Sequence, residues 1–212
     1  MGHPDKDRTD TDSFPELTRR LAEHPEDWER VRGRVRSEFD AIAERWETMI
    51  GSHHLVAVRA ALQRVPTAHR VLDLGTGTGL VARLLARRHP SARVVGLDLS
   101  ESMLNTAAAA GLPANVTYVA GDGAALPFPD ASFDLVVALN VFVFWDEATR
   151  VLAPAGSLAI AYSSGEDTPI SLPVADVRRH LAAAGPYSFV DGRTDPGTWV
   201  LAEKARRSPS TE

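Results

Sequence analysis

The chain has 212 residues, of which 44% are hydrophobic and 24% charged, and its formal net charge is −5. These values are typical of one globular α/β domain with a short additional segment, and the acidic balance argues against a dedicated nucleic-acid-binding protein. Because the sequence contains no cysteine, disulfides, thiolate metal ligands and a cysteine nucleophile are excluded.

The two ends of the sequence are polar. Residues 1–13 contain no hydrophobic stretch of a secretory signal, and no apolar run approaches the ~20 residues that cross a bilayer. We therefore expect a cytoplasmic protein without a membrane span. Residues 1–13 and 206–212 are expected to form disordered tails, because they offer little apolar surface to bury.

Residues 14–65 are predicted to form a helical N-terminal cap. Apolar residues recur there at three- and four-residue steps, namely Trp28, Val31, Val35, Phe39, Ile42, Trp46, Met49 and Ile50. A break is expected at Gly51-Ser52. Four arginines lie between Arg30 and Arg36, and the nearby acidic residues Glu26, Asp27, Glu29 and Glu38 can pair with them, which favours a solvated helix surface over a phosphate or RNA contact.

Strand and helix patterns alternate across residues 66–205. Short apolar runs predict seven strands, at 71–74, 93–98, 116–119, 135–139, 157–162, 187–190 and 198–202. Helical patterns fall between them at 80–88, 101–110 and 174–184. This order predicts a Rossmann-like doubly wound α/β fold with a mostly parallel seven-stranded sheet.

A glycine-rich loop follows the first predicted strand. Gly75, Gly77 and Gly79 lie between strand 71–74 and helix 80–88, where an open α/β sheet binds its ligands and where glycine lets the backbone approach them. Asp98 ends the second predicted strand, and an acidic side chain there can accept hydrogen bonds from both hydroxyls of a ribose. The alternative for Asp98 is a surface carboxylate near a helix N-terminus.

Four stretches together resemble the class I S-adenosylmethionine-dependent methyltransferases, within them the type 11 small-molecule group that includes quinone-biosynthesis C-methyltransferases. These stretches are VLDLGTGTG (71–79), VVGLDLSESML (94–104), GDGAALPFPDASFDLVV (121–137) and RVLAPAGSLAIAY (150–162). The third glycine falls one place earlier than in the nicotinamide fingerprint G-x-G-x-x-G, which disfavours an oxidoreductase. The resemblance implies S-adenosylmethionine as the cofactor.

The resemblance also implies a set of cofactor-binding residues. The methionine end of the cofactor would lie on the loop of Asp73, Gly75, Thr76, Gly77 and Gly79. The ribose would bind Asp98, and the adenine would contact Leu99, Met103, Asp122, Gly123 and Ala124. Asn140 would lie near the transferred methyl group, and Trp46 would cover the site. The alternatives are a turn residue for Asp122, a strand-end polar residue for Asn140 and a core aromatic for Trp46.

The expected reaction is methyl transfer to a small apolar or aromatic acceptor on O, N or C. Since the sulfonium methyl is already activated, alignment is the main task, and a base is needed only where the acceptor loses a proton. His53, His54 and Asn140 are the weak catalytic candidates, and no metal site is expected. We expect a monomer or homodimer with no nucleic-acid partner.

Two departures from the family pattern stand out. The usual P-G-G turn is Pro154-Ala155-Gly156, and the segment between Leu139 and Arg150 is about ten residues shorter than in relatives. The short segment allows at most a short helix, and its apolar run 141–145 could be an acceptor wall or core. It also motivates an alternative function, which is S-adenosylmethionine binding without methyl transfer.

Overall fold

The structure of the chain is a computed structural model that describes Ser13 and residues 16–17, 20–21 and 24–206. The expected tails at 1–13 and 206–212 lie outside the described residues, apart from Ser13 and Arg206. Among the described residues, no helix is both long and apolar enough to cross a membrane.

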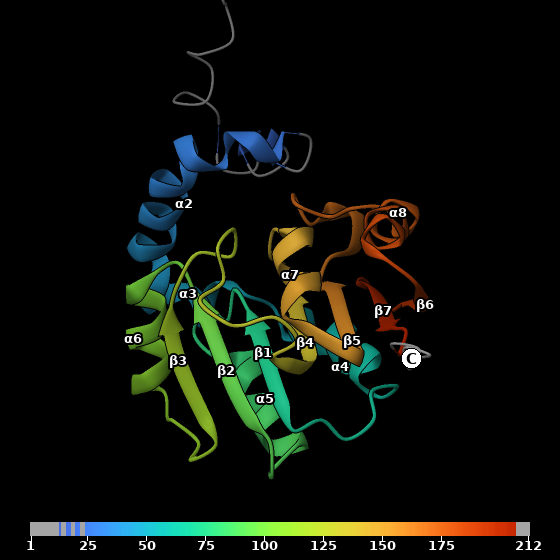
Figure 1. Cartoon of the computed structure of the whole chain (residues 1–212). Coiled ribbons are helices and arrows are strands. Elements are labelled where there is room, and N and C mark those ends of the chain that lie inside the picture. The colour runs from blue at the N-terminus through green and yellow to red at the C-terminus, as the bar shows by residue number, and fades with distance from the viewer. Residues whose placement is uncertain (1–12, 14–15, 18–19, 22–23, 207–212) are drawn as a thin grey trace, which may run out of the picture.

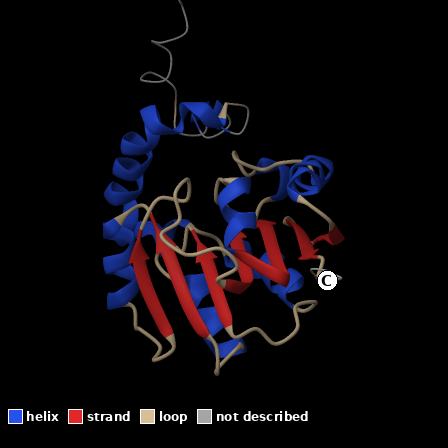
Figure 2. Cartoon of the chain, viewed as in Figure 1, coloured by secondary structure: helices blue, strands red, loops and turns tan. Residues whose placement is uncertain are grey.

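A seven-stranded sheet forms the centre of the molecule (Figures 1 and 2). Its strands are β1 (Arg70–Leu74), β2 (Arg93–Asp98), β3 (Val116–Ala120), β4 (Phe133–Leu139), β5 (Leu152–Tyr162), β6 (Tyr187–Arg193) and β7 (Thr198–Lys204). The spatial order is β3-β2-β1-β4-β5-β7-β6, and β7 pairs antiparallel with both β5 and β6. The predicted doubly wound, mostly parallel fold is therefore confirmed.

Helices cover both faces of the sheet. On one face, α4 (Val56–Leu62) and α5 (Leu80–Arg88) share a buried cluster with the strands. On the other face, α7 (Trp145–Val151) and α8 (Val174–Ala184) share a second buried cluster. The central strands are apolar on both sides, as in β4, where Leu135, Val136 and Val137 are all fully buried, because a parallel sheet is covered on both faces.

The N-terminal segment lies above the carboxyl ends of the strands in the view of Figure 1. It contains η1 (Pro25–Asp27), α2 (Trp28–Ile42), η2 (Ala43–Arg45), α3 (Trp46–Met49) and η3 (Ser52–Leu55). Extended backbone at Ile50 and Gly51 separates α3 from η3, where the sequence predicts a break. The arginines of α2 pair with nearby acids, as Arg30 does with Asp27.

Two elements remain, a helix after β2 that packs against the N-terminal segment and a short turn after β5. Helix α6 (Glu101–Ala109) follows β2, and its N-cap Ser100 accepts a hydrogen bond from the Met103 amide. The turn η4 (Gly165–Asp167) follows β5. Strand β5 begins at Leu152 rather than at residue 157, because the Pro154-Ala155-Gly156 turn is accommodated as an irregularity in its pairing with β4.

Candidate functional site

The glycine loop adopts a backbone that only glycine tolerates well. Gly75, Gly77 and Gly79 have φ of 62°, 53° and 78°, in the left-handed region. A Cβ on Gly75 would also lie 2.5 Å from Val141 Cγ2, whereas a Cβ on Gly77 would meet only Trp46 Nε1, at 3.8 Å. The loop therefore packs tightly against Val141 at Gly75, whereas at Gly77 it has room for a side-chain carbon next to the Trp46 indole.

Asp98 holds this loop from the end of β2. Its Oδ2 accepts a hydrogen bond from the Gly77 amide at 2.8 Å, and its Oδ1 accepts one from the Ser100 amide at 2.9 Å. Burial raises the pKa of Asp98, and these backbone amides partly oppose the rise. Since a carboxylate can accept about four hydrogen bonds, Asp98 keeps acceptor positions for a ligand.

Asp73 lies beneath the loop rather than on its ligand side. Its side chain is buried and accepts a hydrogen bond from the Thr76 hydroxyl at 2.5 Å. Burial raises the pKa of Asp73 from 3.8 to about 7, and the nearby Asp98 adds to the rise. In this position Asp73 shapes the loop through Thr76.

A cavity of about 170 Å³ opens at this edge of the sheet. Nine of the residues that the sequence assigns to the cofactor line it, namely Trp46, Gly75, Thr76, Gly77, Asp98, Leu99, Met103, Gly123 and Asn140. Four others do not line it, namely Asp73, Gly79, Asp122 and Ala124. The fold therefore gathers residues from the ends of β1, β2 and β4 and from the N-terminal segment around one space.

Hydrogen bonds tie the N-terminal segment over this cavity. Asp40 of α2 accepts a bond from the Ser100 hydroxyl at 2.6 Å, at the N-terminus of α6. Glu47 of α3 accepts bonds from Thr78 Oγ1 and Arg83 Nη2, both at 2.9 Å. Trp46 lies near Gly77 and forms part of the cavity wall.

Asp122 has partners that the sequence did not indicate. The indole N–H of Trp28 donates to both of its oxygens, at 2.9 and 3.0 Å, and Arg32 donates to Oδ2 at 3.2 Å. The Ala124 amide donates to Oδ1 at 2.8 Å. The acceptor positions of Asp122 are thus occupied by groups of the chain itself, two of them from α2.

Trp28 is a cavity residue that the sequence prediction did not include. Its position on the apolar face of a helix indicates only a core residue, yet it lines the cavity and packs edge-on against Phe144, with ring centroids 5.1 Å apart. Phe39 and Phe142 also line the cavity. Sequence periodicity could not distinguish these aromatics from ordinary core residues, because both lie on a buried face.

Asn140 joins the ends of β4 and β5. Its amide nitrogen donates to Ser163 Oγ at 2.7 Å, and its amide oxygen accepts from the Ser163 backbone at 2.8 Å. Its φ is 52°, a conformation that asparagine adopts more readily than most residues. Asn140 thus lies at the cavity while its side chain performs a structural role.

The two neighbouring histidines face different environments. His54 lines the cavity and lies edge-on to Trp46, with ring centroids 6.2 Å apart. Burial lowers the pKa of His54, so its neutral form predominates. His53 does not line the cavity and lies against Gly51 instead. Of these two catalytic candidates, only His54 has access to the site.

A second cavity, of about 410 Å³, lies between α7 and α8. It shares four wall residues with the first cavity, namely Val141, Phe142, Phe144 and Ile170. Three of them, Val141, Phe142 and Phe144, belong to the short segment after β4.

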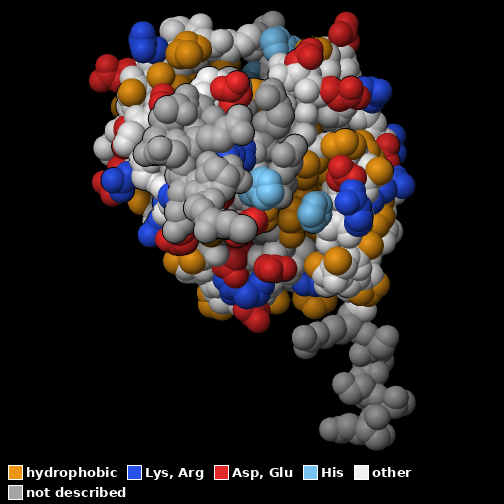
Figure 3. Space-filling view, turned by 90° about the horizontal axis from the view of Figure 1, so that it is seen from above, with side chains coloured by type: hydrophobic (Ala, Val, Ile, Leu, Met, Phe, Trp, Pro, Cys, Tyr) orange, Lys and Arg blue, Asp and Glu red, His pale blue; other side chains and the backbone are white. Residues whose placement is uncertain are grey.

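The molecular surface seen from above is mixed in character. Hydrophobic side chains are exposed there beside two histidines near the centre, among interspersed acidic and basic side chains (Figure 3).

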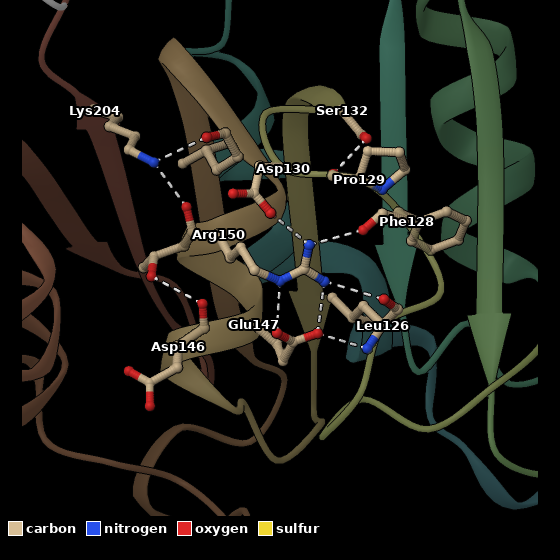
Figure 4. A network of polar contacts seen from close by, with 11 residues as sticks. Leu126, Phe128, Pro129, Asp130, Ser132, Asp146, Glu147, Arg150 and Lys204 are labelled. Atoms are coloured by element: carbon tan, nitrogen blue, oxygen red, sulfur yellow. Dashed lines mark hydrogen bonds and ion pairs between the residues drawn. The ribbon is translucent and has the colours of Figure 1, made fainter.

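A network of hydrogen bonds and ion pairs fixes the loop after β3 to α7 (Figure 4). Arg150 donates to both oxygens of Glu147, at 2.7 and 2.8 Å, and to the backbone oxygens of Leu126 and Phe128, at 3.0 and 2.8 Å. Glu147 in turn accepts from the Leu126 amide at 2.6 Å. Arg150 therefore fixes the loop at Leu126 and Phe128 to α7, the helix that follows the segment 141–144.

Within the described part of the chain, no group of three or more histidines and carboxylates could hold a metal ion. The wall of the first cavity is instead mainly apolar, and its polar side chains are those of His54, Thr76, Thr78, Asp98 and Asn140. This arrangement suits an organic ligand that carries hydroxyl groups.

Comparison with known proteins identifies relatives of the chain. Residues 71–156 match a family model described as a methyltransferase domain. Demethylmenaquinone methyltransferase from Thermus thermophilus is 44% identical over 115 residues, which are 49% of this chain and 50% of the relative. The protein of that name from Corynebacterium kroppenstedtii is 32% identical over 188 residues, which are 82% of this chain and 79% of the relative.

Solved structures share the fold. A methyltransferase from Haloferax volcanii, solved in complex with the Trm112 methyltransferase activator, superposes with a TM-score of 0.68 at 22% identity. The match covers 80% of this chain and 98% of that one. The chain spans about half the length of several curated relatives that it matches.

Proposed function

Since the chain belongs to the class I S-adenosylmethionine-dependent methyltransferases, we propose that it transfers a methyl group from S-adenosylmethionine to a small apolar or aromatic acceptor. The observation that carries the proposal is the convergence of the glycine loop and Asp98 on one mainly apolar cavity. The demethylmenaquinone methyltransferases among its relatives are named for a small-molecule acceptor, which supports an acceptor of that kind.

The residues present fit this cofactor. Gly77 leaves space at the loop because a Cβ there would have no close neighbour, and Asp98 has acceptor positions beyond its two backbone partners. Asp98 would bind the ribose hydroxyls, and Leu99 and Met103 would pack against the adenine. Thr76 and Gly77 would face the methionine end from the loop.

S-adenosylmethionine supplies an activated methyl group when it is bound. The contribution of the chain is then to position the acceptor and exclude water. Trp46, Phe142 and Phe144 line the cavity with apolar surface, which limits solvent at the reacting end. Among the described residues, neutral His54 is the one histidine in the wall of this cavity, and it can accept a proton from acceptors that must lose one.

Calorimetric titration with S-adenosylhomocysteine tests the cofactor assignment. We expect Asp98→Asn to weaken binding by about 10- to 100-fold, because it removes a charged acceptor from two hydroxyl groups. Glu203→Gln is the matched control, since Glu203 is an exposed carboxylate on β7. No binding to the wild-type protein would refute the proposal.

A turnover assay then separates methyl transfer from cofactor binding alone. Formation of S-adenosylhomocysteine that depends on an added acceptor is expected for a transferase. Binding without turnover across a broad panel of phenols, amines and quinols would instead favour a cofactor-binding protein, the alternative that the short segment after β4 suggests.

A further inference from the structure

The second cavity adjoins the first one, which is the cofactor cavity of the proposed function, because the two share wall residues. Val141 packs against Gly75 of the glycine loop on one side and lines the second cavity on the other. Phe144 and Ile170 likewise face both spaces. A molecule in the second cavity would therefore lie next to the space assigned to the cofactor, on the side of Gly75 and Val141.

Flat ring surfaces form much of the wall of the second cavity. The indole of Trp145 on α7 stacks on the imidazole of His180 on α8, with centroids 4.9 Å apart and planes inclined by 4°. Phe142 and Phe144 meet edge to face, with centroids 4.9 Å apart. Planar faces and edges of this kind favour an aromatic ligand, which gains stacking energy beyond the burial of its surface.

The charge of the wall is negative. Asp146 and Glu147 line the second cavity, and among the described residues neither cavity has a lysine or arginine in its wall. Glu147 is paired with Arg150, whereas Asp146 is exposed in the first turn of α7. An anionic acceptor would thus meet a carboxylate and no compensating cation, which disfavours its binding.

We propose that the second cavity is the acceptor site, that the Trp145–His180 pair is its stacking surface, and that it admits planar aromatic molecules that are neutral or cationic but not carboxylates. This inference rests on the proposed methyl transfer for its functional meaning. The binding site itself is independent of that function, so each can be tested separately.

Binding of two isosteric probes tests the charge selection. Calorimetry would compare 2-naphthol, which is uncharged at neutral pH, with the anion 2-naphthoate, both with and without saturating S-adenosylhomocysteine. We expect 2-naphthol to bind at least tenfold more tightly. Asp146→Lys should reduce or reverse this preference. The control Glu203→Lys, at an exposed position on β7 outside the cavity wall, should leave it unchanged. Equal affinity for the two probes in the wild-type protein would overturn the charge selection.

Removal of the stacking surface tests the location of the site. His180→Ala, at an exposed position, should weaken 2-naphthol binding about three- to tenfold and leave the affinity for S-adenosylhomocysteine unchanged. The control His69→Ala removes an exposed histidine before β1. If 2-naphthol does not bind, or binds equally to His180→Ala and wild type, the inference fails. If S-adenosylhomocysteine does not bind to the wild type, the proposed function fails, while the 2-naphthol result still decides the acceptor site.

Discussion

Two carboxylates at the ligand edge of the sheet differ in what they can still bind. Asp98 accepts hydrogen bonds from two backbone amides, one on each oxygen, and lines the cavity. Asp122 accepts from Trp28, Arg32 and Ala124 and does not line the cavity. At the scale of the residue, hydrogen-bonding capacity therefore separates a carboxylate that keeps acceptor positions for a ligand from one that is committed to the chain itself.

A single-residue prediction concerns the turn within β5. Ala155 has φ of 60°, where an L side chain costs about 1 kcal/mol relative to glycine. We expect Ala155→Gly to raise the free energy of unfolding by about 0.5–1 kcal/mol, measured by urea denaturation. The control Ala153→Gly, at a buried position outside the left-handed region, should lower it. Destabilisation by Ala155→Gly would contradict this account of the turn.

The titration of Asp73 predicts a pH dependence of stability. Its pKa rises from 3.8 to about 7 on folding because the carboxyl is buried, so the folded chain keeps a proton that the unfolded chain has released between these values. The free energy of unfolding should therefore fall as the pH rises through this window, by at most about 4 kcal/mol from this group.

Asp73→Asn removes that titration. Urea denaturation across the same window should show the wild type losing stability relative to Asp73→Asn as the pH increases. The exposed-site variant Asp167→Asn serves as the control and should follow the wild type. A difference between wild type and Asp73→Asn that stays constant with pH would show that Asp73 ionises normally.

At the scale of the element, helix α2 contributes to the site through its first turn. Trp28 begins α2, lines the cofactor cavity and donates its indole N–H to Asp122. If the adenine amino group binds Asp122, as the family resemblance implies, it must compete with this indole. The helix therefore controls access to one carboxylate of the site.

Trp28→Phe tests this competition, because it keeps a buried aromatic ring and removes the indole N–H donor. We expect S-adenosylhomocysteine to bind several-fold more tightly to the variant in calorimetry, since a carboxylate acceptor becomes free. S-inosylhomocysteine, which lacks the amino group, is the matched ligand and should gain nothing. Weaker binding of both ligands to Trp28→Phe would mean that the indole organises the site instead.

At the scale of the whole molecule, the N-terminal segment and the α/β body meet around the cofactor cavity. Asp40 and Glu47 provide polar ties from the segment to Ser100, Thr78 and Arg83. The segment is also held by hydrogen bonds from Trp28 and Arg32 to Asp122 and by a small apolar cluster of its own residues, against which side chains of the body pack, whereas the sheet has two separate buried clusters. This division predicts that the segment can open without unfolding of the sheet.

Hydrogen exchange measured by mass spectrometry tests this prediction. In the variant Asp40→Asn/Glu47→Gln, amides of α2 and α3 should exchange about tenfold faster, since charge-assisted hydrogen bonds are weakened, while β1 and β4 should be unaffected. Glu38→Gln, at an exposed position on the same helix, is the control. Uniformly faster exchange in the sheet would show that segment and body unfold as one unit.

The sequence by itself determined the sheet, the glycine loop and Asp98. Apolar runs, glycine spacing and strand ends are local patterns, and the backbone conformations that they require are local as well. The mostly parallel direction of the strands follows from the right-handed helical connections between successive strands. For this reason the loop at 75–79 and the carboxylate at the end of β2 could be placed at one edge before any coordinates were known.

Only the tertiary structure decided which side chains turn toward the ligand. The indole of Trp28 and the carboxylate of Asp122 are 94 residues apart, and the Trp145–His180 stack joins α7 and α8, which β5 and η4 separate in the chain. The partner of Asn140 is likewise Ser163, on the next strand connection. Such pairings depend on the packing of distant elements, which periodicity along one element does not encode.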